Sequence, residues 1–169
     1  MYTFKILLLS FMLCTIATTN AQNSFRKYTS EKGEKIAFAR GIEIDKGYGS
    51  TYEFYPYYRA GKYFMIIDEF LTSCYGQCEF YFYFIVDKGE KVYERHFLGA
   101  PYRQSEAGTY VQIEIGVDAE FFRTLARAQN LDFIISDHKL RKWKEFDNSF
   151  THKDLRGFRD FAIGMGLME

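Results

Sequence analysis

Two cysteines enclose a short loop between strand-like segments, and they form the most specific chemical feature of the sequence. Cys74 and Cys78 flank the tripeptide Tyr75-Gly76-Gln77. Residues that face each other across antiparallel strands lie within the Cα separation that a disulfide requires. The CxxxC spacing differs from the CxxC of redox dithiols, and no second pair follows at zinc-binding spacing. We therefore predict a structural disulfide; a redox dithiol, a metal half-site and two unlinked thiols are the alternatives.

Tyrosines crowd into one region of the chain, where they could form a contact surface. Tyrosine offers a large contact area with few rotatable bonds, and its ring stacks on sugars. A second candidate is the polar, glycine-containing segment Leu98 to Thr109, which resembles a long surface loop. The predicted ligand- or partner-binding residues are Tyr48, Tyr52, Tyr55, Tyr57, Tyr58, Tyr102 and Arg103. The alternative is that these tyrosines cover one side of the core.

The histidines and common motifs give no catalytic or metal site. His96, His138 and His152 lie in three separate segments without HxH, HxxxH or HExxH spacing. The sequence contains no GxSxG motif, P-loop or dinucleotide-binding GxGxxG motif. We expect no catalytic residue, no metal and no cofactor.

One carboxylate falls on an apolar strand face. Asp68 and Glu69 are adjacent, so on a strand they point to opposite faces and cannot share a proton. We expect Asp68 to form a structural ion pair with Arg40, Arg59 or Arg95. A glycosidase would need two carboxylates at a defined separation, which a sequence does not supply.

The elements that position these residues are strands. Two runs flank the cysteine loop, and the second alternates Phe and Tyr from Phe80 to Phe84. Successive side chains on a strand point to opposite faces. We expect Phe80, Phe82, Phe84 and Val86 in the core. Tyr81, Tyr83 and Ile85 should form a half-covered outer face.

The remaining segments predict a mainly β fold. Residues 36–44 should form one strand with Ile36, Phe38, Ile42 and Ile44 on one face. Residues 51–58 should form another, whose end is an edge or a bend because of Pro56. Helices should begin at Asp118 and Thr151. We predict an antiparallel sheet or β-sandwich of about six to eight strands, with one or two C-terminal helices packed on it.

The N-terminus has the features of an export signal. A short cationic start, an apolar stretch and Thr19-Asn20-Ala21 predict a signal peptide over residues 1–21. Residues 22–35 should form a flexible polar leader, and residues 36–169 a single globular domain. Cleavage would leave two cysteines for a periplasmic or extracellular protein, and no later stretch is long enough for a transmembrane helix.

Charge and composition narrow the function classes. Lys plus Arg and Asp plus Glu number 22 each, so no net charge favours nucleic acid. We predict an exported, small, non-catalytic binding domain for a protein or glycan partner. The alternatives are a secreted or periplasmic hydrolase and a small apolar-ligand carrier. The oligomeric state does not follow from the sequence.

Overall fold

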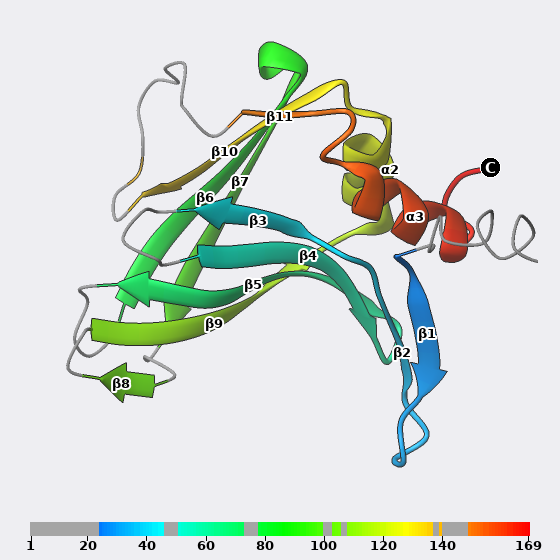
Figure 1. The fold of residues 1–169 in the computed structure, drawn as a ribbon, viewed down its shortest axis with the longest axis horizontal. Helices are drawn as coiled ribbons and strands as arrows, with labels where there is room; N and C mark the ends of the chain where they lie inside the picture. The colour runs from blue at the N-terminus through cyan, green and yellow to red at the C-terminus, as the bar shows by residue number, and fades with distance from the viewer. Residues whose placement is uncertain are drawn as a thin grey trace, which may run out of the picture.

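The computed structural model describes residues 24–45, 51–72, 78–99, 103–105, 108–136, 139 and 149–169. These residues form two antiparallel sheets that face each other, with helices α2 and α3 together at one end (Figure 1). The mainly β class with C-terminal helices packed on sheets is therefore confirmed.

The larger sheet has seven strands in the order β1-β2-β4-β5-β9-β8, and β3 pairs with β4 as a continuation of β2. The strands are β1 (Arg26–Thr29), β2 (Lys35–Phe38), β3 (Ile42–Asp45), β4 (Thr51–Arg59), β5 (Lys62–Thr72), β8 (Arg103–Ser105) and β9 (Gly108–Val117). Segment 22–35, expected to be a leader, thus supplies β1, so the sheet begins before residue 36.

The smaller sheet has four strands in the order β11-β10-β6-β7. Its strands are β6 (Cys78–Val86), β7 (Lys91–Gly99), β10 (Asn130–Ser136) and β11 (Ser149–Thr151), with the short helix η1 (Asp87–Gly89) between β6 and β7. The helices are α2 (Ala119–Arg127) and α3 (Arg156–Gly164). The described residues form 11 strands, more than the six to eight expected. The excess has two sources: the strands β1, β8 and β11 are only three or four residues long, and the predicted strand 36–44 is divided into β2 and β3.

Phenylalanine rings from both sheets fill the core. Phe54 of β4 lies 4.6 Å from the ring centre of Phe133 and 6.4 Å from that of Phe84. Phe82, Phe84 and Phe133 are buried, as the alternation of β6 predicts for the first two. The direct ring contacts hold the two sheets together.

The outer face of β6 is more covered than predicted. Tyr83 has no exposed surface, and Ile85 is 5% exposed. Both pack with Ile134 and partly buried Tyr81 in a second, smaller apolar cluster. The prediction of a half-covered tyrosine face is wrong for Tyr83 and holds only for Tyr81.

A β-bulge divides the strand predicted over residues 36–44. The four steps from Phe38 to Ile42 face only three steps of β4, from Tyr57 to Phe54. One extra residue reverses which face each later side chain occupies. Ala37 and Ile42 therefore both face the core, whereas Phe38 lies outside it, so the shared face predicted for Phe38 and Ile42 is wrong.

Pro56 lies opposite this bulge and does not end β4. The strand continues through Pro56 to Arg59 and pairs with β5 along this whole stretch. Proline has no N–H to donate, and it is tolerated inside a sheet where a bulge interrupts the neighbouring ladder. Pro56 therefore neither ends the strand nor places it at an edge of the sheet.

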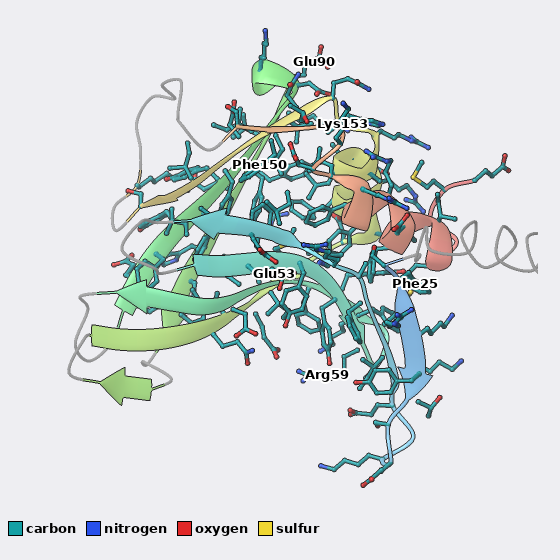
Figure 2. All side chains as sticks on the ribbon, in the orientation of Figure 1. Phe25, Glu53, Arg59, Glu90, Phe150 and Lys153 are labelled. Carbon is teal, nitrogen blue, oxygen red and sulfur yellow. The ribbon has the colours of Figure 1, made fainter. Side chains whose placement is uncertain are left out.

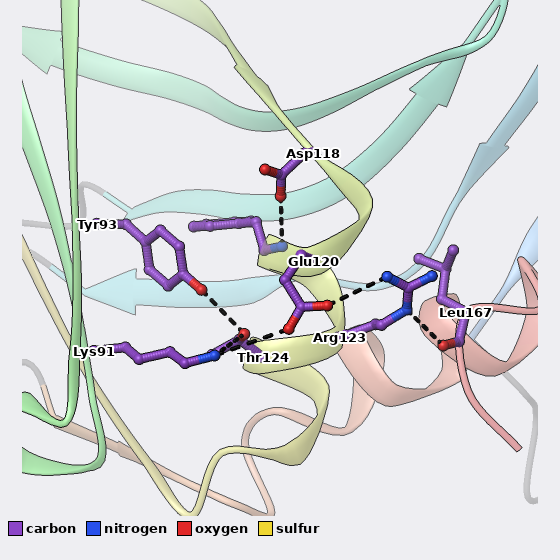
Figure 3. A network of polar contacts seen from close by, with 8 residues as sticks. Lys91, Tyr93, Asp118, Glu120, Arg123, Thr124 and Leu167 are labelled. Atoms are coloured by element: carbon purple, nitrogen blue, oxygen red, sulfur yellow. Dashed lines mark hydrogen bonds and ion pairs between the residues drawn. The ribbon is translucent and has the colours of Figure 1, made fainter.

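Helix α2 begins as predicted and is tied to the smaller sheet. The Asp118 carboxylate accepts a hydrogen bond from the Phe121 N–H at 2.8 Å, which satisfies a free donor of the first turn. Figure 3 shows the polar contacts that follow: the Tyr93 hydroxyl donates to Thr124 at 3.0 Å, and Arg123 donates to the Leu167 carbonyl at 3.0 Å. These bonds link β7, α2 and the segment after α3.

Helix α3 starts later than predicted. Thr151 donates its N–H and hydroxyl to the Asp154 carboxylate, both at 2.8 Å. These bonds stabilise a turn, and the helix itself begins at Arg156. Leu155, Phe158 and Phe161 are then buried in the core, where the rings of Phe158 and Phe161 contact the larger sheet and α2. No helix within the described ranges is long and apolar enough to span a membrane.

Candidate functional site

A groove lies on the outer face of the larger sheet. Its volume is about 430 Å³. The lining residues come from the N-terminal segment, the bulge and the two central strands, and combine aromatic rings with both signs of charge. They are Ser24, Arg26, Tyr28, Phe38, Ala39, Arg40, Glu53, Tyr55, Tyr57 and Asp68. We name this site the aromatic groove.

The bulges explain why aromatic and charged side chains meet here. Phe38 pairs directly with Tyr57 and shares its outward face, and the β2–β3 bulge then turns Ile42 to the core face. Tyr28 of the edge strand β1 packs edge-on against Phe38, with ring centres 6.3 Å apart. A second bulge, in β5 between Ile67 and Phe70, interrupts pairing with β9 next to Asp68. Bulges commonly re-aim side chains beside functional sites.

Two carboxylates stand at the centre of the groove. The strand register places Glu53 directly opposite Asp68. Like charges at such a position destabilise a sheet unless donors offset them. The Gly41 N–H donates to Glu53 at 2.8 Å, and the Gln112 side chain donates to Asp68 at 3.0 Å. The groove thus contains oriented hydrogen-bond acceptors.

The Tyr55 hydroxyl, which is influenced by both carboxylates, keeps its proton. Burial, with added repulsion from Asp68 and Glu53, raises the pKa of Tyr55 to about 12. Burial also raises the pKa of Tyr57, although nearby Arg59 opposes this shift. Both phenols are therefore neutral hydrogen-bond donors and acceptors at physiological pH.

Strand β4 carries a further charged side chain beyond Tyr57, at Arg59, which does not line the groove. Figure 2 shows Glu53 and Arg59 at two points of the bent strand β4, on the lower side of the sheet in this view. Arg59 pairs with Glu114 of β9 at 3.1 Å and lies 5.7 Å from the ring centre of Phe64. The Arg59–Glu114 pair joins β4 to β9 across the intervening strand β5.

The structure brings together only part of the predicted binding set. Tyr55 and Tyr57 line the aromatic groove. Tyr58 lies on the opposite side of β4, where its ring contacts Tyr63 at 5.1 Å beside the core.

The other predicted positions are not described fully enough to place their side chains. Tyr52 belongs to β4 and Arg103 begins β8, but only their backbones are described. Tyr48, Tyr102 and Cys74 lie outside the described residues, and of Cys78 only the backbone is described. The disulfide therefore stays a prediction.

Several groove residues were missed by sequence reasoning. Arg26 and Tyr28 lie in the segment expected to be a flexible leader. Phe38 and Arg40 were expected on one continuous strand. The signal that could have revealed them was the Arg40-Gly41 pair, which interrupts the apolar alternation of residues 36–44.

His96 forms a small polar cluster on the other sheet. Its Nε2 lies 2.9 Å from a Glu79 oxygen that also accepts a hydrogen bond from the Tyr81 hydroxyl at 2.8 Å. The rings of His96 and Tyr81 stack at 4.6 Å. The Tyr81 and His96 hydrogen bonds lower the pKa of Glu79. Cross-strand pairing accounts for this cluster, because Tyr81 and His96 are opposite each other in the β6–β7 ladder.

Comparisons with protein-family models, with curated proteins and with solved structures found no match to this chain. Its function must therefore be inferred from the geometry of the site.

Proposed function

We propose that this protein is a small carbohydrate-binding domain that takes its ligand in the aromatic groove. The observation that carries the proposal is the combination of Tyr28, Phe38 and Tyr57 with Glu53 and Asp68 in one hollow. Sugar rings present C–H faces that pack on the electron-rich face of an aromatic ring. Their hydroxyls both donate and accept, which suits oriented carboxylates, guanidinium groups and neutral phenols.

A glycan fits these observations better than a protein partner. Stable protein interfaces bury at least about 1,000 Å² and contain an apolar centre. Over the described part of the chain, the large hydrophobic side chains with the greatest exposure are Tyr28, Val92, Leu98 and Ile163. They are distributed over β1, β7 and α3, and only Tyr28 lines the groove.

The core gives no support to a carrier of apolar ligands. Such a protein needs an open interior, whereas Phe54, Phe84 and Phe133 meet directly between the sheets in the described residues. We therefore do not propose that function.

Binding measurements with two groove variants test the proposal. The folded protein is titrated by calorimetry with neutral malto-, cello- and chito-oligosaccharides. Tyr55→Ala and Tyr57→Ala should each weaken binding about tenfold or more, because each removes a stacking surface and a hydroxyl. Tyr81→Ala is the matched control, since it removes a tyrosine from the other sheet, and it should leave affinity unchanged.

Absence of binding to every oligosaccharide would contradict the proposal. Equal weakening by Tyr81→Ala and Tyr57→Ala would also contradict it, because the effect would then not belong to the groove. Circular dichroism of each variant separates lost binding from lost folding.

One observation favours hydrolysis as a second function. Glu53 and Asp68 are directly opposite in the same groove, and paired carboxylates cleave glycosidic bonds with one as acid and the other as base or nucleophile. Incubation with the same oligosaccharides, followed by mass spectrometry, should reveal shorter products if the pair is catalytic. Glu53→Gln and Asp68→Asn should then abolish product formation, and an intact substrate would exclude this function.

Export remains part of the proposal. The predicted signal peptide lies outside the described residues. N-terminal sequencing of the protein from its own host should give Gln22 as the first residue if cleavage follows Ala21.

A further inference from the structure

A second hollow adjoins the aromatic groove at the beginning of α3. Its volume is about 400 Å³. It is lined by Ser24, Arg40, Gly41, Ile42, Glu43, Phe150, Lys153, Asp154, Arg156 and Gly157. Ser24 and Arg40 line both hollows, so the two are neighbours separated by these residues.

The boundary between the hollows is fixed by α3. The Ser24 N–H and hydroxyl donate to the Asp160 carboxylate at 3.2 and 2.7 Å. A methyl group on Gly157 would lie 1.7 Å from the Arg40 carbonyl oxygen, so only glycine allows the helix to approach this closely. The backbone of the bulge and the first turn of α3 therefore pack directly against each other.

The second hollow repeats the chemistry of the first. Half-buried Phe150 supplies an aromatic ring, Lys153 and Arg156 supply donors, and Asp154 supplies an acceptor. The Arg40 side chain between the hollows is 74% exposed and forms a 3.5 Å pair with Glu43. It can therefore donate to a ligand on either side.

We infer that the two hollows are consecutive subsites for one extended oligosaccharide, with Arg40 at the junction between them. This inference rests on the proposed function and adds the ligand class: a chain of several sugar residues rather than a single terminal sugar. One end of the chain stacks on the groove tyrosines, and the other lies over Phe150 at the beginning of α3.

Affinity as a function of chain length tests this arrangement. Calorimetry is performed with monosaccharide to hexasaccharide members of the malto-, cello- and chito-series. The longest member should bind about tenfold more tightly than the disaccharide, because only it reaches both subsites. Lys153→Ala and Arg156→Ala should remove most of this gain without changing disaccharide affinity. Lys62→Ala, a control at an exposed lysine that lines neither hollow, should change nothing.

The results separate the extended site from the proposed function. Equal affinity for disaccharide and hexasaccharide, or an unchanged hexasaccharide affinity in both Lys153→Ala and Arg156→Ala, would overturn the extended site alone. Lack of binding by all chain lengths would overturn the proposed function and the extended site together. Tyr57→Ala should weaken every length that binds, because the groove is common to all of them.

Discussion

Strands β4 and β6 have the same kind of sequence and different environments. Both are rich in phenylalanine and tyrosine, and both are internal strands with a neighbour on each side. Tyr83 of β6 has no exposed surface, whereas Tyr55 and Tyr57 of β4 line an open groove. The difference shows that alternation assigns side chains to a face but does not decide which faces become covered.

The phenylalanines of the two strands behave alike, in contrast to their tyrosines. Phe54 of β4 and Phe82 of β6 are both fully buried and both contact Phe133. The inner face is common to both strands because each sheet must bury one apolar side against the other. The exposure of the outer face depends on what lies over it, so Tyr83 belongs to the core whereas Tyr55 and Tyr57 line a groove.

The largest effect on stability is predicted for a substitution on the buried face of β6. Phe82→Ala should reduce the free energy of unfolding by about 3–5 kcal/mol, because it leaves a cavity between stacked rings. Urea denaturation followed by circular dichroism measures the change. Tyr57→Ala is the comparison from the open face of β4 and should cost much less. A loss below about 1 kcal/mol for Phe82→Ala would mean that the inner face is not the stabilising one.

The predicted disulfide should have the next largest effect. Reduction of a Cys74–Cys78 bridge should lower stability by roughly 2 kcal/mol, since the bridge restricts the unfolded chain. Alkylation of the purified mature protein without reductant, followed by mass measurement, tests whether the bridge exists. Complete labelling of both cysteines under these conditions would disprove it.

The close approach of α3 to the bulge at Gly157 can be tested by adding a methyl group there. Gly157→Ala should destabilise the protein by about 1–3 kcal/mol, because the added methyl group overlaps the Arg40 carbonyl. Helix propensity alone predicts the opposite sign, a gain of up to about 1 kcal/mol. Gly116→Ala is the control, since no atom lies within 4 Å of its added methyl group. A more stable Gly157→Ala variant in the same denaturation assay would contradict the close approach of α3 to the bulge.

The smallest predicted effect is the loss of stability at alkaline pH that accompanies ionisation of Tyr55. The pKa of Tyr55 is raised from 10.0 in the unfolded chain to about 12 in the folded protein. The folded state therefore keeps a proton that the unfolded state has lost, so stability is complete below pH 10 and decreases as pH rises towards 12. Phenolate absorbance should show a most alkaline step that Tyr55→Phe removes. Survival of this step in Tyr55→Phe would assign it to another tyrosine.

Much of the fold followed from local patterns in the sequence. The inner phenylalanines of β6 and the N-cap at Asp118 were both predicted from spacing and residue type. These features depend on interactions within a few residues, or on a face that must be buried in any packed sheet.

The candidate site was less predictable because it depends on register. Tyr55 and Tyr57 were identified from their residue type, but which side of β4 meets the smaller sheet, and so whether these tyrosines or Tyr58 face the core, depends on tertiary packing. Phe38 joins them because it pairs with Tyr57, whereas one extra residue at the bulge places Ile42 on the core face. Such an insertion is defined by the partner strand, so it leaves little trace in local periodicity.

The sequence by itself determined that this chain forms antiparallel sheets with phenylalanine on the buried side, because alternation and β-branched or aromatic residues favour a pleated layer wherever it is placed. The tertiary structure decided which tyrosines became core and which line a groove. It also decided that Glu53 and Asp68 face each other, and that α3 approaches Arg40 at a glycine. These outcomes depend on contacts between residues far apart in the chain, which arise only when the strands pair and the helices pack against them.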